Sequence, residues 1–124
     1  MNLSLAQVVV TEHKPSPIAA PFTLATIRGE IDLSNAEDIG LQLNDASQQC
    51  TDLIVDLSAV TYIDSQGARI LQHLANRHAY GALRLILLAP PNSVARKLLS
   101  ITAIDQTVPV FDSLDVAVRQ EQAE

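Results

Sequence analysis

One segment, Asp56-Leu57-Ser58-Ala59-Val60-Thr61-Tyr62-Ile63-Asp64-Ser65-Gln66-Gly67, gives the strongest indication of the fold. It follows an apolar run, Leu53-Ile54-Val55, that is typical of a strand buried on both faces. An amphipathic pattern that predicts a helix begins at Ala68. We therefore expect a strand over Asp52–Asp56, then a turn, then a helix. Ser65 is the expected N-cap, because a serine oxygen there accepts a hydrogen bond from an orphan backbone N–H.

Two roles are open for Ser65. The simpler one is the helix cap itself. The other is a phosphorylation switch, because a phosphate at a helix N-terminus meets free N–H groups and a favourable helix dipole.

Composition limits the class of function. The 124 residues suffice for one domain with a core and are too few for two. The formal net charge of −6 argues against binding nucleic acid or an anionic membrane, which requires clustered Lys and Arg. No apolar run approaches the roughly 18–20 residues that span a bilayer, and the N-terminus lacks the basic region of a signal peptide. Cys50 is the only cysteine, so we expect a reducing, cytoplasmic location.

Strands and helices alternate along the chain. Strands are expected over Leu3–Thr11, Phe22–Asp32, Asp52–Asp56, Leu83–Leu88 and Val108–Phe111, the last of them at an edge because of Pro109. Helices are expected from Ser34, from Ser65 to a C-cap at Gly81, after Ser93, and from Asp112 or Ser113. The order β-β-α-β-α-β-α-β-α predicts an α/β fold with a mixed, mainly parallel sheet of about five strands and about four helices.

The first two helical segments have further local signals. Ser34 and Glu37 have the spacing of a capping box. An inward stripe is expected at Ala36, Ile39, Gly40, Leu43, Ala46, Ser47 and Cys50. Gly40 costs about 1 kcal/mol relative to alanine, which indicates close packing at that point. In the helix after Ser93, the expected inward residues are Val94, Leu98 and Ile101.

The residues argue against catalysis and against a metal site. A nucleophile elbow requires glycine at position 63, which is Ile63. On the helix that Ser65 starts, His73 and His78 lie roughly 12 and 20 Å along the axis, beyond the reach of a base. These two histidines are also about 140° apart around the helix, so they share no metal-binding face, and we expect both to be solvated. We therefore expect no catalytic residue, no metal and no cofactor.

Three segments together resemble the STAS-domain family of bacterial anti-sigma factor antagonists. They are Gly29-Glu30-Ile31-Asp32, Asp56-Leu57-Ser58 and Tyr62-Ile63-Asp64-Ser65-Gln66-Gly67, which match the family pattern Gly-Glu-Leu-Asp, a strand, then Asp-Ser-Ser/Thr-Gly. The predicted order of elements is similar to that of the family as well.

This resemblance implies a partner switch. An anti-sigma factor serine kinase binds the unmodified antagonist and releases its sigma factor. The kinase then phosphorylates the serine after the motif Asp, here Ser65, and a phosphatase resets it. The family implies a monomer whose partner-binding residues are Gly29, Glu30, Ile31, Asp32, Asp64, Ser65, Gln66, Gly67, Ala68 and Arg69.

This sequence departs from the family pattern at three positions. Gln66 replaces a second hydroxyl residue, so Ser65 is the only acceptor in the motif. Ala68 replaces a common leucine and loses an apolar contact. Arg69 stands where a small residue is usual, and two roles are open for it: obstruction of the family contact, or pairing with a phosphate on Ser65 one turn back.

Two other functions are compatible with the sequence. One is a STAS module that serves as a scaffold or sensor in another signalling complex. The other is a binder of a small anion or nucleotide on the rim formed by Gly29–Asp32 and Asp64–Gly67.

Overall fold

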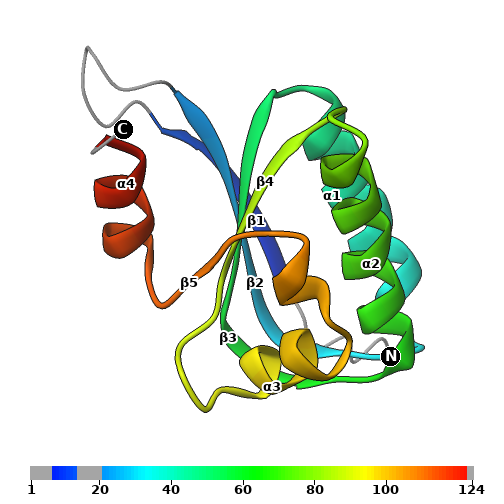
Figure 1. Ribbon diagram of the computed structural model, residues 1–124. Coiled ribbons are helices and arrows are strands. Elements are labelled where there is room, and N and C mark those ends of the chain that lie inside the picture. Colours follow the sequence, from blue (N-terminus) through cyan, green and yellow to red (C-terminus); the bar gives the residue numbers. More distant parts are fainter. Residues whose placement is uncertain (1–6, 14–20, 123–124) are drawn as a thin grey trace.

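The structure, a computed structural model, describes residues 7–13 and 21–122. Its centre is a five-stranded sheet in the order β1-β2-β3-β4-β5 (Figure 1). Only β1 is antiparallel to its neighbour. The strands are β1 (Gln7–His13), β2 (Phe22–Ile31), β3 (Asp52–Ile63), β4 (Arg84–Leu88) and β5 (Val110–Phe111). The helices are α1 (Ala36–Gln48), α2 (Ser65–Ala79), α3 (Val94–Ile101) and α4 (Leu114–Gln122), with a short 3-10 helix, η1 (Ile104–Gln106).

The predicted order of elements and the mainly parallel sheet are confirmed. β5 lies at an edge, directly after Pro109, as expected. The expected first strand began at Leu3, and residues 3–6 and the proline-rich loop at 14–20 lie outside the described part of the chain. η1 was not predicted, since three residues carry too little periodicity to detect.

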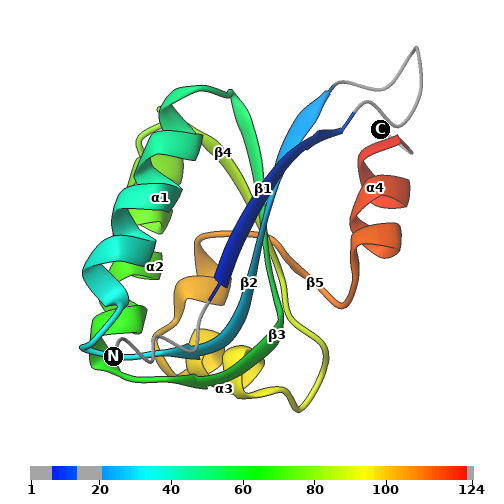
Figure 2. The ribbon, with the colours of Figure 1, turned by 180° about the vertical axis from the view of Figure 1, so that it is seen from behind.

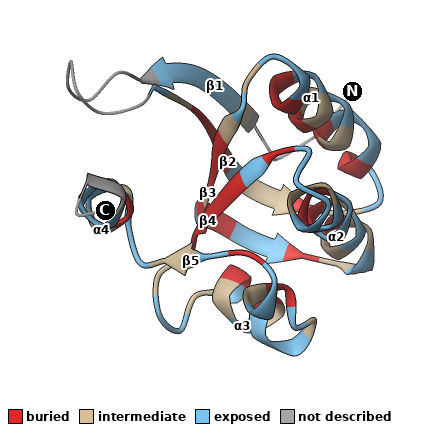
Figure 3. Ribbon diagram, turned by 45° about the horizontal axis from the view of Figure 1, so that its top comes forward, coloured by how far each residue is buried: buried red, intermediate tan, exposed pale blue. Residues whose placement is uncertain are grey.

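Helices cover both faces of the sheet. α1 and α2 lie side by side on one face, α4 lies alone on the other, and α3 lies at the end of the sheet where β3 leads into α2 (Figures 1 and 2). The larger core fills the α1/α2 side and includes Leu43, Leu71 and Leu85. A smaller core beneath α4 is formed by Leu24, Ile54, Ile86, Leu88 and Ala117. Figure 3 shows the buried residues along the central strands and on the sheet-facing sides of α1 and α2.

The third strand is longer than predicted. It runs to Ile63 instead of ending in a turn after Asp56, because β2 pairs with it as far as Ile31. Two register shifts each place one extra residue in β3. At the first shift the Asp56 carboxylate accepts hydrogen bonds from the backbone N–H and the hydroxyl of Ser58. This paired extension brings the ends of β2 and β3 together beside the start of α2.

Two predictions about helices were wrong. α1 begins at Ala36 with Asn35 as its N-cap, so Ser34 and Glu37 form no capping box. In α3 the buried residues are Ala95 and Leu99. The predicted inward residues are partly buried (Leu98) or exposed (Val94, Ile101).

The rotation of α3 has a local cause. The Arg96 guanidinium donates to the Ala89 carbonyl at 2.8 Å and pairs with Asp112 at 3.0 Å. These contacts fix the side of the helix that faces the end of the sheet, which apolar spacing alone does not define.

Other helix ends agree with the sequence. Gly81 follows α2 with φ +78°, a left-handed conformation that glycine adopts without strain. Ser93 caps α3, and the Ser113 hydroxyl oxygen accepts from the Val116 N–H at the start of α4. The inward stripe of α1 is confirmed, with Gly40 and Cys50 partly buried.

Candidate functional site

Asp64 organises the start of α2. Its backbone is extended, and its Oδ1 accepts hydrogen bonds from the N–H groups of Gln66 at 2.9 Å and Gly67 at 3.2 Å. Asp64 is therefore the N-cap, and Ser65 is the first helical residue, so the prediction that Ser65 caps the helix was wrong. Asp and Ser are equally favoured N-caps, so the sequence could not distinguish these two adjacent positions.

The same carboxylate ties α2 to the turn that precedes α1. Asp64 Oδ2 accepts from the Leu33 N–H at 3.1 Å, and the Asp64 N–H donates to the Ile31 carbonyl at 3.1 Å. The buried Asn35 closes that turn: its Oδ1 accepts from the Asp32 N–H, and its Nδ2 donates to the Glu30 carbonyl. The segments Gly29–Asp32 and Asp64–Arg69, far apart in the sequence, are joined into one rim.

Gly67 allows the close approach of α2 to the sheet. A Cβ at this position would lie 2.5 Å from Ile63 Cγ2 and 2.9 Å from Ile31 Cγ2. Contacts this short do not occur for real Cβ atoms, so any side chain would push the helix away from the strand ends. The motif glycine therefore sets the position of the first turn of α2, and with it the position of Ser65.

Ser65 is exposed, and within the described part of the chain no hydrogen bond engages its hydroxyl. The first turn of α2 contains no acidic residue, whereas that of α1 contains Glu37 and Asp38. Within the described residues at the start of α2, the Asp64 cap is therefore the one negatively charged side chain that faces the positive end of the helix dipole. A group that is negatively charged and carried by Ser65 would lie next to this end.

The remaining predicted site residues lie around this centre. Gly29 and Glu30 pair with Val60 and Tyr62 near the end of the sheet, and Gly29 has φ +93° at the second register shift. Ala68 and Gln66 are half-buried, and Arg69 is exposed one helical turn after Ser65.

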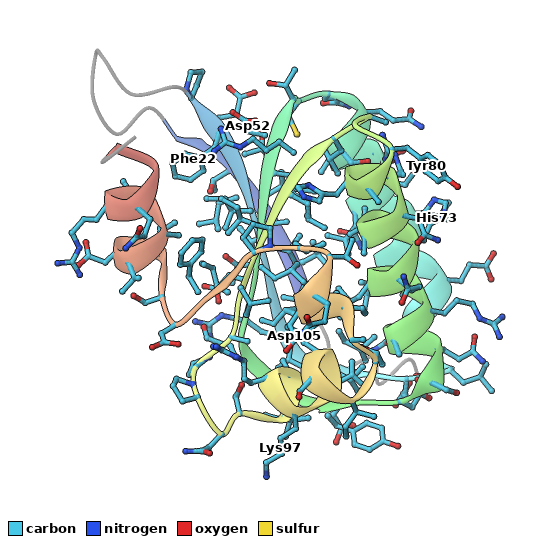
Figure 4. The ribbon with its side chains drawn as sticks, viewed as in Figure 1. Phe22, Asp52, His73, Tyr80, Lys97 and Asp105 are labelled. Atoms are coloured by element: carbon cyan, nitrogen blue, oxygen red, sulfur yellow. The ribbon has the colours of Figure 1, made fainter. Side chains whose placement is uncertain are left out.

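His73, His78 and Cys50 take structural or exposed positions. His73 is exposed on α2 (Figure 4). His78 was expected to be solvated, which was wrong: it is partly buried, and its Nδ1 accepts from the Leu85 N–H at 2.9 Å. Cys50 is partly buried and donates to the Ala46 carbonyl. Burial raises the pKa of the Cys50 thiol, which disfavours the reactive thiolate.

Within residues 7–13 and 21–122, no group of three or more His, Cys, Asp or Glu side chains is arranged to hold a metal ion. None of the helices in this part of the chain is both long enough and apolar enough to cross a membrane.

The sequence model of the STAS domain family matches residues 9–117 of this chain. The chain belongs to the STAS domain family. The match includes every strand from β2 onward and the whole rim around Asp64. No curated protein matches the chain significantly.

Solved structures share the STAS fold at low sequence identity. An anti-sigma factor antagonist from Mycobacterium paratuberculosis is 22% identical, with a TM-score of 0.78 over 94% of both chains. The Bacillus cell fate determinant SpoIIAA in its phosphorylated form is 18% identical, with a TM-score of 0.62 over 90% of this chain and 98% of that one. A sulfate transporter family protein from Wolinella succinogenes is 18% identical, with a TM-score of 0.68 over 89% of this chain and 90% of that one.

Proposed function

We propose that this STAS domain is an anti-sigma factor antagonist that binds an anti-sigma factor serine kinase and is released when the kinase phosphorylates Ser65. The observation that carries the proposal is the exposed Ser65 hydroxyl at the first position of α2, which no other described residue engages, on a rim fixed by Asp64, Asn35 and Gly67. The similarity to the Mycobacterium paratuberculosis antagonist supports it, as does the similarity to SpoIIAA, an anti-sigma factor antagonist that has also been solved in a phosphorylated form.

The charge on a phosphate supplies the switch. Phosphorylation adds about −1.5 to −2 charges at neutral pH. At the N-terminus of α2 the helix dipole stabilises this negative charge by about 0.3–1 kcal/mol, so the fold tolerates the phosphate. In a packed interface an uncompensated charge costs on the order of 3–5 kcal/mol, and each 1.4 kcal/mol is about tenfold in affinity. One phosphate therefore weakens binding by about a hundredfold or more without unfolding the domain.

Arg69 has a part in this switch. It lies at i+4 from Ser65, and side chains at this spacing are neighbours on a helix surface. We expect its guanidinium to pair with the phosphate and to stabilise the released form. Of the two roles open for Arg69, its exposed position one turn from the serine favours this one.

The partner-binding surface in this proposal is the rim of Gly29–Asp32 and Asp64–Arg69. The domain acts as a monomer in the bacterial cytoplasm, where sigma factors work, and it has no catalytic activity of its own. A serine phosphatase restores the unmodified form.

Intact-mass spectrometry after incubation with ATP and the anti-sigma factor kinases of the same organism tests the proposal. The wild type should gain one phosphate and Ser65→Ala none. Ser34→Ala is the matched control, because Ser34 is also an exposed serine at a helix start, and it should gain one phosphate. A phosphate retained by Ser65→Ala would move the switch to another residue. No phosphate with any kinase would contradict the proposed function.

A second candidate function is a STAS module within another assembly. The similarity to a sulfate transporter family protein favours it, since the TM-score is comparable to those of the antagonists. Such a module would bind its assembly whether or not Ser65 is modified. Pull-downs with the wild type and Ser65→Glu distinguish the two, because only the antagonist should lose its partner in the variant.

A further inference from the structure

A groove of about 560 Å³ runs between α1 and α2 and opens to solvent beside the proposed phosphorylation site. Gly40 and Ile70 line it, and two leucines from its α1 side, Leu33 and Leu41, are 77% and 58% exposed. Because these leucines line the same recess as Gly40 and Ile70, they form one contiguous apolar surface, and such surfaces mark interaction sites. The groove also includes Gln66 and Arg69, so it is continuous with the rim around Ser65.

Gly40 gives this groove a depth that the fold itself does not need. A Cβ added at Gly40 would lie 3.5 Å from Ile70 Cγ1, which is ordinary van der Waals contact. The packing that the sequence indicated at Gly40 therefore leaves room for a Cβ. A glycine in the middle of α1 still weakens the helix relative to alanine. Such a local cost without a structural benefit is expected where a site needs the space.

The two sides of the groove differ in charge. Arg69 and His73 lie one turn apart along the α2 side, in a chain whose formal net charge is −6. Glu37 lies on the α1 side. Figure 4 shows His73 on the side of α2 that points away from the sheet. An occupant that complements this arrangement has an apolar side toward Gly40 and Ile70 and acidic residues toward α2.

We infer that the groove binds an amphipathic helix of the kinase partner, with apolar side chains against Leu41, Gly40 and Ile70 and an acidic side against Arg69 and His73. The stretch of α2 from Gln66 to His73 is about 10 Å long, which corresponds to two turns of such a helix. This inference rests on the proposed function. It adds a second contact area, separate from the switch at Ser65, that supplies affinity.

Affinities of the unphosphorylated full chain for the kinase, measured by isothermal titration calorimetry, test the inference. Leu41→Ser removes an exposed anchor, and Gly40→Leu fills the recess. Each should weaken binding about tenfold or more, the effect expected of an anchor in a pocket. Gly40→Leu should not lower the melting temperature, because leucine is the better helix former. Tyr80→Ser is the matched control: Tyr80 is 89% exposed at the far end of α2, and its loss should change affinity less than twofold (Figure 4).

The outcomes separate the groove from the switch. Weaker binding by both groove variants, with Tyr80→Ser unchanged, supports the inference. Wild-type affinity in Leu41→Ser and Gly40→Leu, with a wild type that binds and gains a phosphate at Ser65, overturns the groove and leaves the proposed function standing. A wild type that neither binds nor is phosphorylated by any kinase overturns both.

Discussion

Helices α1 and α2 lie side by side on the same face of the sheet and start with the same three kinds of residue (Figure 2). Each has a serine at its start, an Asn or Asp as N-cap, and a glycine within its length. The pairs are Ser34 and Ser65, Asn35 and Asp64, Gly40 and Gly67. In each pair, however, the two residues have different contacts.

The start of α1 is closed on itself. The Ser34 hydroxyl donates to Asp32 at 2.5 Å, and Asn35 is 5% exposed and hydrogen-bonded within its own turn. At the start of α2, by contrast, the Asp64 cap accepts from the Leu33 N–H, and Gly67 lies close against two strand ends. The Ser65 hydroxyl has no hydrogen bond within residues 7–13 and 21–122. The comparison teaches that Ser65 is available for chemistry because Asp64, one residue earlier, provides the cap.

The largest expected effect on binding separates the two serines. Ser65→Glu should weaken binding to the kinase partner about a hundredfold, because it buries an uncompensated charge in the interface. Ser34→Glu should weaken it by less than about tenfold. The reason is that Asp32 already makes that part of the rim negative in the binding-competent form. Titration calorimetry of both variants measures the difference. Equal losses of affinity would break the distinction between the two serines.

Alanine substitutions at the two glycines should change the free energy of unfolding in opposite directions. Gly67→Ala should lower the free energy of unfolding by about 3 kcal/mol, since its Cβ would overlap Ile63 and Ile31. Gly40→Ala should raise it by about 0.5–1 kcal/mol, because alanine favours the helix and its Cβ fits. Urea denaturation of the two variants tests this. A stable Gly67→Ala protein would mean that α2 does not approach the sheet as closely as the structure shows.

Replacing the Asp64 cap should affect amides in a larger part of the chain than replacing the Asn35 cap. Asp64→Ala should cost about 2 kcal/mol, from the cap of α2 and the bond to Leu33. Hydrogen exchange should show lost protection at Leu33, Gln66 and Gly67. Asn35→Ala should expose only the turn before α1, chiefly the Asp32 amide. Asp64→Asn, which keeps the cap oxygen and loses the acceptor for the Leu33 N–H, serves as the control and should cost about 1 kcal/mol.

The smallest expected effects are the changes in stability when the two serine hydroxyls are removed. Ser65→Ala should change the free energy of unfolding by less than about 0.5 kcal/mol, because Ser65 is not the cap and its hydroxyl has no hydrogen bond among the described residues. Ser34→Ala should lose slightly more, about 0.5–1 kcal/mol, with its hydrogen bond to Asp32. Thermal denaturation of both measures the difference. If Ser65→Ala instead lost about 1 kcal/mol, the usual contribution of an N-cap, Ser65 and not Asp64 would be the residue that caps α2.

Much of the fold could be predicted from local patterns. The apolar runs of β3 and β4, the stripe of α1 and the glycine after α2 each have a strong local signal. The sequence failed where two neighbours were equally suited, as with Asp64 and Ser65 at the cap of α2. It failed again in α3, where apolar residues at helical spacing occur on two sides and the contacts of Arg96 select Ala95 and Leu99.

The candidate site divides in the same way. Local sequence patterns predict the order of elements, the serine with its flanking Asp and Gly, and the family to which they belong, because hydrophobic periodicity and turn chemistry are encoded locally. Three features are visible only in the folded chain: β3 continues to Ile63, Asp64 joins two distant segments, and a groove opens between α1 and α2. These features depend on strand pairing and packing between residues about thirty positions apart, and such long-range contacts leave no periodic signal in the chain.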